Sequence, residues 1–391
     1  MVSGRGKSKF KDPSLGSPTL GSRGRRDGRR STTGGLVKLV LVLAVVAGLL
    51  EVGARLIDKI PFEARNYVAE QLSLLKSAYP TVYDADLGYI PEPSYSSSAN
   101  PWSVQITTDD LGLRAIQPPP AIGPDSVAVL TVGDSFTFGG EVSDSETWPA
   151  RLSELLAAPV GNAGVFGYGL DQSVLRAERL APLLSPWAIV VAFKYEDILR
   201  TELVQRAGVE KPYFELVEGQ LQLRNSPPQK FHPRIAQLGV LRTVTGYSYL
   251  ADFAMRGFGL TDWWYAGGLT EVRAHQDGPS VACLLMRRLK ALEAATGARV
   301  LVMAQYVARA FTDPSSPATE TELTGSRQLL DCAETQGLAT IDTYDAWAEL
   351  AARDQSAFLS RMFLRSHLSP AGNQAVADAV ADGLFQVLAG D

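Results

Sequence analysis

The sequence predicts an α/β fold in which a parallel β-sheet carries helices on both faces and one transmembrane helix precedes the sheet domain. From Val127 onward, short apolar runs of strand length alternate with longer segments of helical periodicity, which is the pattern of parallel sheets. The run Trp187–Phe193 is apolar at every position, as strands buried on both faces are. A separate apolar run, Leu36–Ile57, has 22 residues and is long enough to cross a bilayer.

Charge is distributed unevenly along the chain. The net charge of the whole chain is −5. Residues 1–35 contain nine Lys/Arg and two Asp, a charge of +7, so a charge of −12 remains for the rest. This segment is rich in Gly, Ser and Arg and has no apolar period, so we expect a disordered basic tail. The acidic remainder argues against nucleic acid as a partner, because phosphate binding needs a basic face.

Leu36–Ile57 is predicted to anchor the chain in the cell membrane as a single-pass helix. Its charged residues, Lys38, Glu51 and Arg55, lie near its two ends, where long side chains can reach the interface. The basic tail is expected to stay in the cytoplasm, which places the main domain outside, in the periplasm if the cell is Gram-negative. A cleaved signal peptide is the alternative, because the charge-free core Leu39–Leu50 has only 12 residues.

Residues 58–124 are predicted to lead from the anchor to the main domain. Pro61–Tyr79 has apolar residues at helical spacing and is expected to form a juxtamembrane helix. The next stretch is rich in Pro, Ser and Gly and is expected to form loops and short strands over the domain surface. Pro118–Pro120 and Gly123-Pro124 would then make a stiff linker.

The main domain is predicted to occupy residues 125–391. Thr147 is expected to cap a helix whose first turn holds Pro149. The expected core elements are strand 127–132, a helix with Leu152, Leu155 and Leu156 inward, strand Pro159–Asn162, a helix through Leu175 and Leu180, strand Trp187–Phe193, helix Pro279–Ala295, strand Arg299–Gln305, helix Gly325–Gln336, strand Leu338–Ile341 and helix Ser369–Leu388.

The alternation is interrupted between about residues 200 and 271. A hairpin is expected around Glu218-Gly219, and Trp263, Trp264 and Tyr265 form an aromatic cluster beyond it. We expect an insertion that lies over the carboxyl edge of the sheet. The aromatic cluster indicates local core more readily than a platform for sugar rings.

Ser135 is the first candidate catalytic residue. The first core strand ends abruptly at Gly133-Asp134-Ser135, so the serine lies in the crevice beyond the strand ends where open α/β sheets bind ligands. The helix that follows can direct its N–H groups at developing negative charge.

A serine nucleophile needs a base, and the chain has three histidines, His232, His275 and His367. His367 lies on the loop before the last helix, and in a doubly wound sheet that loop also emerges at the carboxyl edge. Ser135 and His367 can therefore meet, although a lone loop histidine is more often a surface residue.

Three motifs occur in order: Gly133-Asp134-Ser135, Asn162-Ala163-Gly164-Val165-Phe166-Gly167 and His367-Leu368-Ser369-Pro370-Ala371-Gly372-Asn373. This ordered set resembles the SGNH (GDSL-like) hydrolases, a family of esterases, lipases and carbohydrate acetyl-esterases, here of a membrane-anchored bacterial type. The resemblance covers about residues 84–388. It implies a flavodoxin-like three-layer αβα sandwich, Ser135 as nucleophile, His367 as general base, and the N–H groups of Ser135 and Gly167 in an oxyanion hole.

Two positions depart from the family pattern. Glu196 stands where the family has an oxyanion-hole Asn, and an ionised carboxylate cannot donate a hydrogen bond. Glu196 is therefore expected to be protonated, to turn away, perhaps toward His367, or to weaken catalysis. Leu364 stands where the family has an Asp three residues before its histidine. Asp342 or Asp345 would then be the third catalytic member, or His367 would bond to a backbone carbonyl and form a dyad.

The function expected from these residues is that of an extracytoplasmic serine esterase or O-acyltransferase acting on acylated envelope carbohydrate or a related ester. The alternative is a catalytically impaired member that binds a glycan or an envelope protein. The sequence has no P-loop and no H-E-x-x-H motif, so no cofactor or metal is expected. Cys283 and Cys332 have no metal-ligand spacing, are expected to be small buried thiols, and are assigned no chemistry.

Overall fold

The structure is a computed structural model that describes residues 32–58, 60–72, 80–100, 102–116, 127–206, 209–229, 239–265, 271–365 and 367–389. The tail predicted for residues 1–35 lies outside these residues up to residue 31, and so does the linker at Pro118–Pro120 and Gly123-Pro124.

Five parallel strands form the central sheet. They are β5 (Val129–Val132), β6 (Val160–Asn162), β7 (Ala188–Phe193), β13 (Arg299–Ala304) and β14 (Ala339–Asp342), in the order β14-β13-β7-β5-β6. Every residue of β5 and β7 is buried. The chain passes from β5 to β6 on one side and then returns to β7 on the other, so the topological switch point lies between β5 and β7. Ligands bind beyond the carboxyl ends of strands at such a point.

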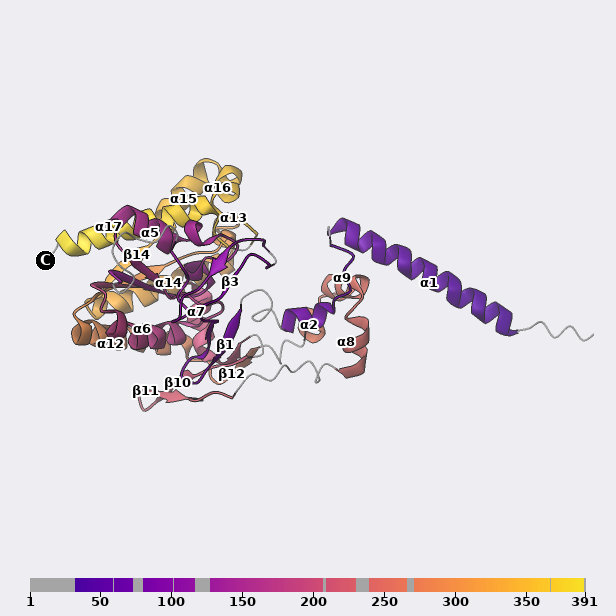
Figure 1. Ribbon diagram of the computed structural model, residues 1–391, viewed down its shortest axis with the longest axis horizontal. Helices are drawn as coiled ribbons and strands as arrows, with labels where there is room; N and C mark the ends of the chain where they lie inside the picture. The colour runs from indigo at the N-terminus through magenta and orange to yellow at the C-terminus, as the bar shows by residue number, and fades with distance from the viewer. Residues whose placement is uncertain are drawn as a thin grey trace, which may run out of the picture.

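Helices cover both faces of this sheet, which confirms the predicted fold class (Figure 1). On one face α5 (Trp148–Leu156) packs against α17 (Pro370–Ala389), and on the other α12 (Gly278–Thr296) packs between α6 (Leu170–Leu184) and α14 (Pro317–Thr335). Thr147 accepts a hydrogen bond from the N–H of Ala150 and caps α5 as expected.

Some details differ from the predictions. The helix predicted to begin at Gly325 is α14, and it begins earlier, at Pro317. Ser316 caps it, and Gly325 is tolerated inside it, where it packs against the ring of Tyr195. Two helices before the last loop, α15 (Tyr344–Arg353) and α16 (Gln355–Met362), were not predicted. Leu155 is exposed and does not face the core.

Short strands from the lead-in and the insertion lie around the sheet. From the lead-in come β1 (Thr81–Asp84), β2 (Gly88–Pro91), β3 (Ser96–Ser97) and β4 (Ile106–Thr107). From the insertion, β8 (Leu203–Arg206), β9 (Val209–Glu210) and β12 (Glu271–Arg273) form a small sheet. The predicted hairpin around Glu218-Gly219 is confirmed as β10 (Tyr213–Val217) and β11 (Gln220–Arg224).

The insertion was predicted to lie over the carboxyl edge of the sheet, but its middle part does not. It forms α8 (Gly239–Thr245), α9 (Tyr249–Gly257) and α10 (Thr261–Trp264). These helices pack with α2 (Tyr67–Leu72) and with the end of α1 (Thr32–Ile57), apart from the sheet domain (Figure 1). The indole of Trp264 is buried against Val68, whereas Trp263 is half exposed. The cluster is thus local core in part, and its partner is the juxtamembrane helix.

The helix α1 is long and apolar enough to cross a membrane from Gly35 to Ile57. Two of its charged residues contact each other and the chain that follows. Glu51 and Arg55 form an i,i+4 ion pair of 2.7 Å, and the Arg55 guanidinium also donates to the carbonyl of Pro61. Of the predicted juxtamembrane helix Pro61–Tyr79, only Tyr67–Leu72 is helical among the described residues.

Cys283 and Cys332 form a disulfide, which corrects the expectation of two buried thiols. The bond joins α12 to α14, with 5.4 Å between the Cα atoms and a sequence separation of 49. Sequence spacing gave no sign of the pairing, because only the packing of the two helices brings these positions together.

Candidate active site

Ser135 begins a single helical turn, α4 (Ser135–Phe138), directly after β5. The Asp134 carboxylate accepts a hydrogen bond from the N–H of Phe136 at 2.8 Å and caps this turn. The turn ends at Gly139, which has a left-handed conformation with φ of 88°. Ser135 is therefore presented at the carboxyl edge, at the switch point between β5 and β7.

The structure brings His367 to Ser135, although 232 residues separate them in the chain. The His367 Nε2 atom lies 2.9 Å from Ser135 Oγ. Asn373 holds the histidine loop in place, because its amide donates to the carbonyls of Leu368 and Ser369 and accepts from the N–H of Trp148 at the start of α5.

The other ring nitrogen of His367 contacts Glu141. The distance from His367 Nδ1 to Glu141 Oε1 is 3.1 Å, and the N–H of Arg365 donates to Glu141 Oε2 at 3.2 Å. Glu141 is buried, with 8% of its surface exposed, and has a φ of 69°. A non-glycine residue in this left-handed region is uncommon and often marks a functional constraint.

This contact corrects the expectation for the third member of the site. The carboxylates of Asp342 and Asp345 bind the guanidinium of Arg327, at 3.1 and 2.7 Å. Asp342 ends β14 and Asp345 follows it, at the far edge of the sheet, which is separated from β5 by β13 and β7. Because Glu141 already occupies Nδ1, the proposed dyad with a backbone carbonyl is also replaced.

The three side chains form a relay that suits nucleophilic chemistry. When Glu141 accepts the Nδ1 proton, the Nε2 atom is left as the acceptor for the Ser135 hydroxyl proton. The approach is close, since a Cβ atom added to Gly140 would lie 3.0 Å from the His367 ring. The small residue at position 140 thus lets the loop pass beneath the imidazole.

Arg114, a buried residue of the lead-in, clamps the loop that carries Glu141. Its guanidinium donates to the carbonyls of Phe138, Gly139 and Val142 and to the Asp144 carboxylate. Five donors in a rigid fork suit such multiple contacts. The clamp spans both sides of Glu141, so Arg114 is a positioning residue for the His367 partner. No motif in the sequence distinguished it.

Replacement of Arg114 by methionine is expected to lower the turnover of an ester substrate by about 10²-fold, the size expected when a catalytic group is displaced by about 1 Å. KM should change little, because the substrate does not touch this buried side chain. The measurement is steady-state kinetics at a temperature where circular dichroism shows the variant folded. As the control, Arg179→Gln removes an ion pair with Asp84 that lies away from this loop. Full activity in Arg114→Met would contradict the clamp.

A buried ionic network surrounds Asp134. The Lys194 ammonium lies 2.7 Å and the Arg200 guanidinium 3.2 Å from Asp134 Oδ2. Burial alone would raise the pKa of Asp134, but these two cations more than offset burial and hold that pKa well below its ordinary value. Burial and the negative charge of Asp134 raise the pKa of the neighbouring Asp197. Asp134 therefore stays ionised at neutral pH and keeps capping the turn that carries Ser135.

Gly167 lies beside this network. It has a left-handed φ of 68°, and the Arg200 guanidinium donates to the carbonyl of the next residue, Tyr168, at 3.3 Å. The hydroxyl of Tyr89, from β2, donates to the carbonyl of Phe166 at 2.8 Å. Backbone contacts on both sides thus hold the Gly167 peptide in place next to the carboxyl end of β6.

Glu196 does not serve as a histidine partner, because both ring nitrogens of His367 have other contacts. It lies at the start of α7 (Tyr195–Leu199), where its charge raises the pKa of Glu322 on α14 after the larger effect of burial. Within the described residues its Oε2 atom is buried with no hydrogen-bond partner. Which of the three expected states Glu196 adopts stays a prediction.

Of the other two histidines, His232 lies outside the described residues. His275 is a half-buried loop residue away from Ser135, and its Nδ1 accepts the N–H of Asp277. No cluster of three or more His, Cys, Asp or Glu side chains that could hold a metal ion occurs in the described part of the chain.

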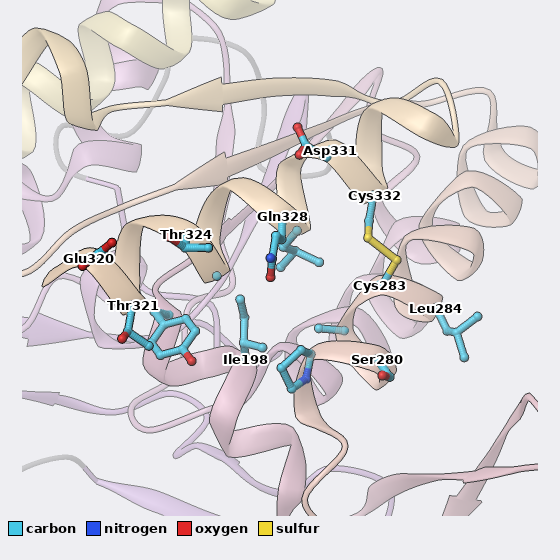
Figure 2. A pocket seen from close by; sticks show the side chains of 15 residues that line it. Ile198, Ser280, Cys283, Leu284, Glu320, Thr321, Thr324, Gln328, Asp331 and Cys332 are labelled. Atoms are coloured by element: carbon cyan, nitrogen blue, oxygen red, sulfur yellow. A yellow bond between two sulfur atoms is a disulfide. The ribbon is translucent and has the colours of Figure 1, made fainter. Parts of the chain in front are cut away.

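A pocket of about 820 Å³ lies elsewhere, between α7, α12 and α14. Figure 2 shows the disulfide in its wall and side chains of α12 and α14, among them Leu284 and Gln328, around it. Ser135, Glu141 and His367 are not among its lining residues, so it is distinct from the candidate active site.

No protein-family model matches the sequence, and no curated protein matches it. Similar solved structures include LAE5, an alpha/beta hydrolase enzyme from the metagenome of Lake Arreo, with 14% identity, TM-score 0.40 and coverage of 67% of this chain and 97% of that one. They also include an acetyl xylan esterase, Axe2, from Geobacillus stearothermophilus, with 15% identity, TM-score 0.37 and coverage of 65% and 93%. A G-D-S-L family protein from Desulfitobacterium hafniense, titled lipolytic, has 10% identity, TM-score 0.35 and coverage of 65% and 98%.

Proposed function

We propose that this protein is a membrane-anchored serine esterase or O-acyltransferase of the SGNH type, with Ser135 as nucleophile, His367 as general base and Glu141 as the partner of His367. The single observation that carries the proposal is the relay of Ser135 Oγ, His367 and Glu141, with contacts of 2.9 and 3.1 Å. A nucleophile bonded to a base that is itself oriented by a third group is the signature of covalent acyl transfer.

In the proposed reaction, Ser135 Oγ attacks the acyl carbon of an ester while its proton passes to His367 Nε2. The N–H groups of Ser135 and Gly167 would stabilise the oxyanion. The alcohol then leaves with the proton from His367, and an acyl-enzyme remains. Water or the hydroxyl of an acceptor sugar attacks this acyl-enzyme, with His367 again as base, and releases the acid or the new ester. Glu141 stabilises the imidazolium formed in each step.

The proposed location is the outer side of the membrane that α1 crosses. The apolar helix at the end of a basic tail supports an anchor with a cytoplasmic N-terminus. The Cys283–Cys332 disulfide supports an extracytoplasmic domain, because such bonds form and persist in oxidising compartments. An acylated envelope carbohydrate is the substrate class that suits this location.

The direct test is covalent labelling by a fluorophosphonate, a probe that reacts with activated serines. The full chain in detergent should be labelled, and peptide mass spectrometry should locate the adduct on Ser135. Ser143, a half-buried serine before the turn Asp144–Glu146 whose hydroxyl accepts from the N–H of Gln105, is the matched control, so Ser143→Ala should keep the label and Ser135→Ala should lose it. A folded wild-type chain that resists the probe would favour the non-catalytic binding function.

A further inference from the structure

The helical insert, residues 239–265, exposes apolar side chains without an evident partner. On α8 no residue is buried, and Val240, Leu241 and Val244 are 82%, 64% and 66% exposed. Elsewhere in the insert, Tyr247, Phe258 and Trp263 are also at least 48% exposed, and Trp263 lies beside α8, because the Arg242 guanidinium donates to its carbonyl. We call these six residues the insert patch. Soluble surfaces rarely carry so many large apolar side chains together, and such patches mark contact with a membrane or a protein.

The insert is attached to α1 through Glu51. The Glu51 carboxylate accepts hydrogen bonds of 2.8 Å from the Ser248 hydroxyl and from the N–H groups of Tyr249 and Leu250, at the first turn of α9. An acidic side chain at a helix N-terminus is favoured by the helix dipole. This contact replaces the water that a carboxylate would otherwise need near the bilayer.

The attachment fixes the level of the insert along α1. Glu51 lies six residues before Ile57, which corresponds to about 9 Å of helix rise. The run Leu36–Ile57 is only slightly longer than the roughly 20 residues that span the hydrocarbon core. The start of α9 is therefore held at the depth where hydrocarbon gives way to headgroups, and not beyond the end of the anchor.

Further contacts make the insert a firm part of this region. The rings of Tyr67 and Tyr249 pack with centroids 5.1 Å apart. The Asn66 amide donates to the carbonyl of Thr243 on α8 at 2.7 Å, and the N–H of Tyr67 donates to the carbonyl of Gly246. Figure 1 shows α2, α8 and α9 grouped beside the end of α1, with the sheet domain beyond them.

We propose that the insert patch lies in the lipid interface of the leaflet at the C-terminal end of α1, so that the protein is held by a helix that crosses the membrane and by a second surface that rests in it. The proposal assumes the anchor of the preceding section. The composition of the insert patch fits contact with lipid, because Trp263 and Tyr247 are of the residue types that are enriched at membrane interfaces. The Arg242 guanidinium, 5.2 Å from the Trp263 ring centroid, places a cation at headgroup level. Continuity with α1 favours lipid over a second copy of the chain.

The interface contact would fix the orientation of the catalytic domain. A single helix would let the domain rotate and tilt freely, whereas two attachments hold it in one orientation at one height. The insertion, which was predicted to lie over the carboxyl edge of the sheet, would then set the distance from the membrane at which an ester is reached.

The test uses the full chain in phosphatidylcholine–phosphatidylglycerol vesicles, with an environment-sensitive fluorophore on single introduced cysteines. The native cysteines are in a disulfide and do not compete for the label. The sites are Val244→Cys in the insert patch, Val42→Cys in the anchor as the lipid control, and Gln222→Cys on the exposed strand β11 as the aqueous control. Quenching is measured with nitroxide-bearing lipids and with iodide in the buffer.

The expected result is that the label at Val244 is quenched by nitroxide lipid and shielded from iodide, as at Val42, while the label at Gln222 shows the reverse. If Val244 behaves like Gln222 while Val42 is quenched by lipid, the interface contact is overturned and the anchor stands. Shielding from iodide without lipid quenching would mean that protein covers the insert patch, which also overturns the proposal. An unquenched label at Val42 would remove the anchor itself, and the proposal with it.

Discussion

Replacement of Ser135 or His367 by alanine is expected to lower the turnover of an activated ester by on the order of 10⁶-fold, the size that such replacements have in a serine protease. Both variants should keep the same residual turnover, because a nucleophile and the base bonded to it at 2.9 Å act as one unit. The double variant Ser135→Ala/His367→Ala should be no slower than either single variant. The measurement is hydrolysis of a p-nitrophenyl ester and of an acylated sugar by the full chain in detergent.

The residual rate should stay above that of water alone, since the backbone N–H groups of Ser135 and Gly167 survive both substitutions and can still polarise the ester. His275→Ala is the matched control for loss of an imidazole and should be as active as wild type. If Ser135→Ala retained more than a tenth of the wild-type rate, another nucleophile would have to be sought.

The sheet and the pair Ser135 and His367 could be predicted because each depends on a short-range pattern. Buried strands are apolar at every position, and the two candidate residues follow a strand or precede a helix at one edge. Packing between distant segments leaves no such pattern. Neither the disulfide across 49 residues nor the contact of Arg114 with the loop after Ser135 could be recognised in the sequence.

Glu141 was missed for a different reason. The carboxylate was sought near His367 and after the last strand, whereas it lies six residues after the nucleophile in the same loop. Its left-handed backbone directs the side chain back under the imidazole, and a conformation of that kind has no residue signature outside glycine.

The position of the insertion helices could not be predicted from the sequence for a third reason. The aromatic cluster Trp263, Trp264 and Tyr265 indicated local core, but residue types do not say which segment the cluster packs against. The indole of Trp264 packs on Val68, and Asp252 accepts hydrogen bonds from Trp264 Nε1 and the Tyr265 hydroxyl. These partners come from the juxtamembrane segment and the insert itself. The prediction that this part lies over the carboxyl edge of the sheet is therefore wrong.

Replacement of Glu141 by glutamine is expected to reduce the turnover by on the order of 10⁴-fold, as loss of the correct histidine tautomer does in a serine protease. The argument depends on the two contacts of the carboxylate. The N–H of Arg365 donates to one oxygen and His367 Nδ1 contacts the other. A glutamine has one oxygen and one NH₂ group. If the oxygen keeps the contact with Arg365, the NH₂ group faces Nδ1 and forces the proton onto Nε2, which can then no longer accept from Ser135.

The controls for Glu141 are the two carboxylates that the sequence suggested in its place. Asp342→Asn and Asp345→Asn weaken the ion pairs with Arg327, and an Asn at position 342 can still accept from the N–H of Tyr344, so turnover should stay within about twofold of wild type, as it does for surface changes of a few tenths of a kcal/mol. Thermal unfolding should show that Glu141→Gln is folded, and a fluorophosphonate should label its Ser135 far more slowly than in wild type, since the nucleophile is no longer activated. Turnover of Glu141→Gln within tenfold of wild type, with Asp342→Asn or Asp345→Asn inactive, would return the third place in the relay to those residues.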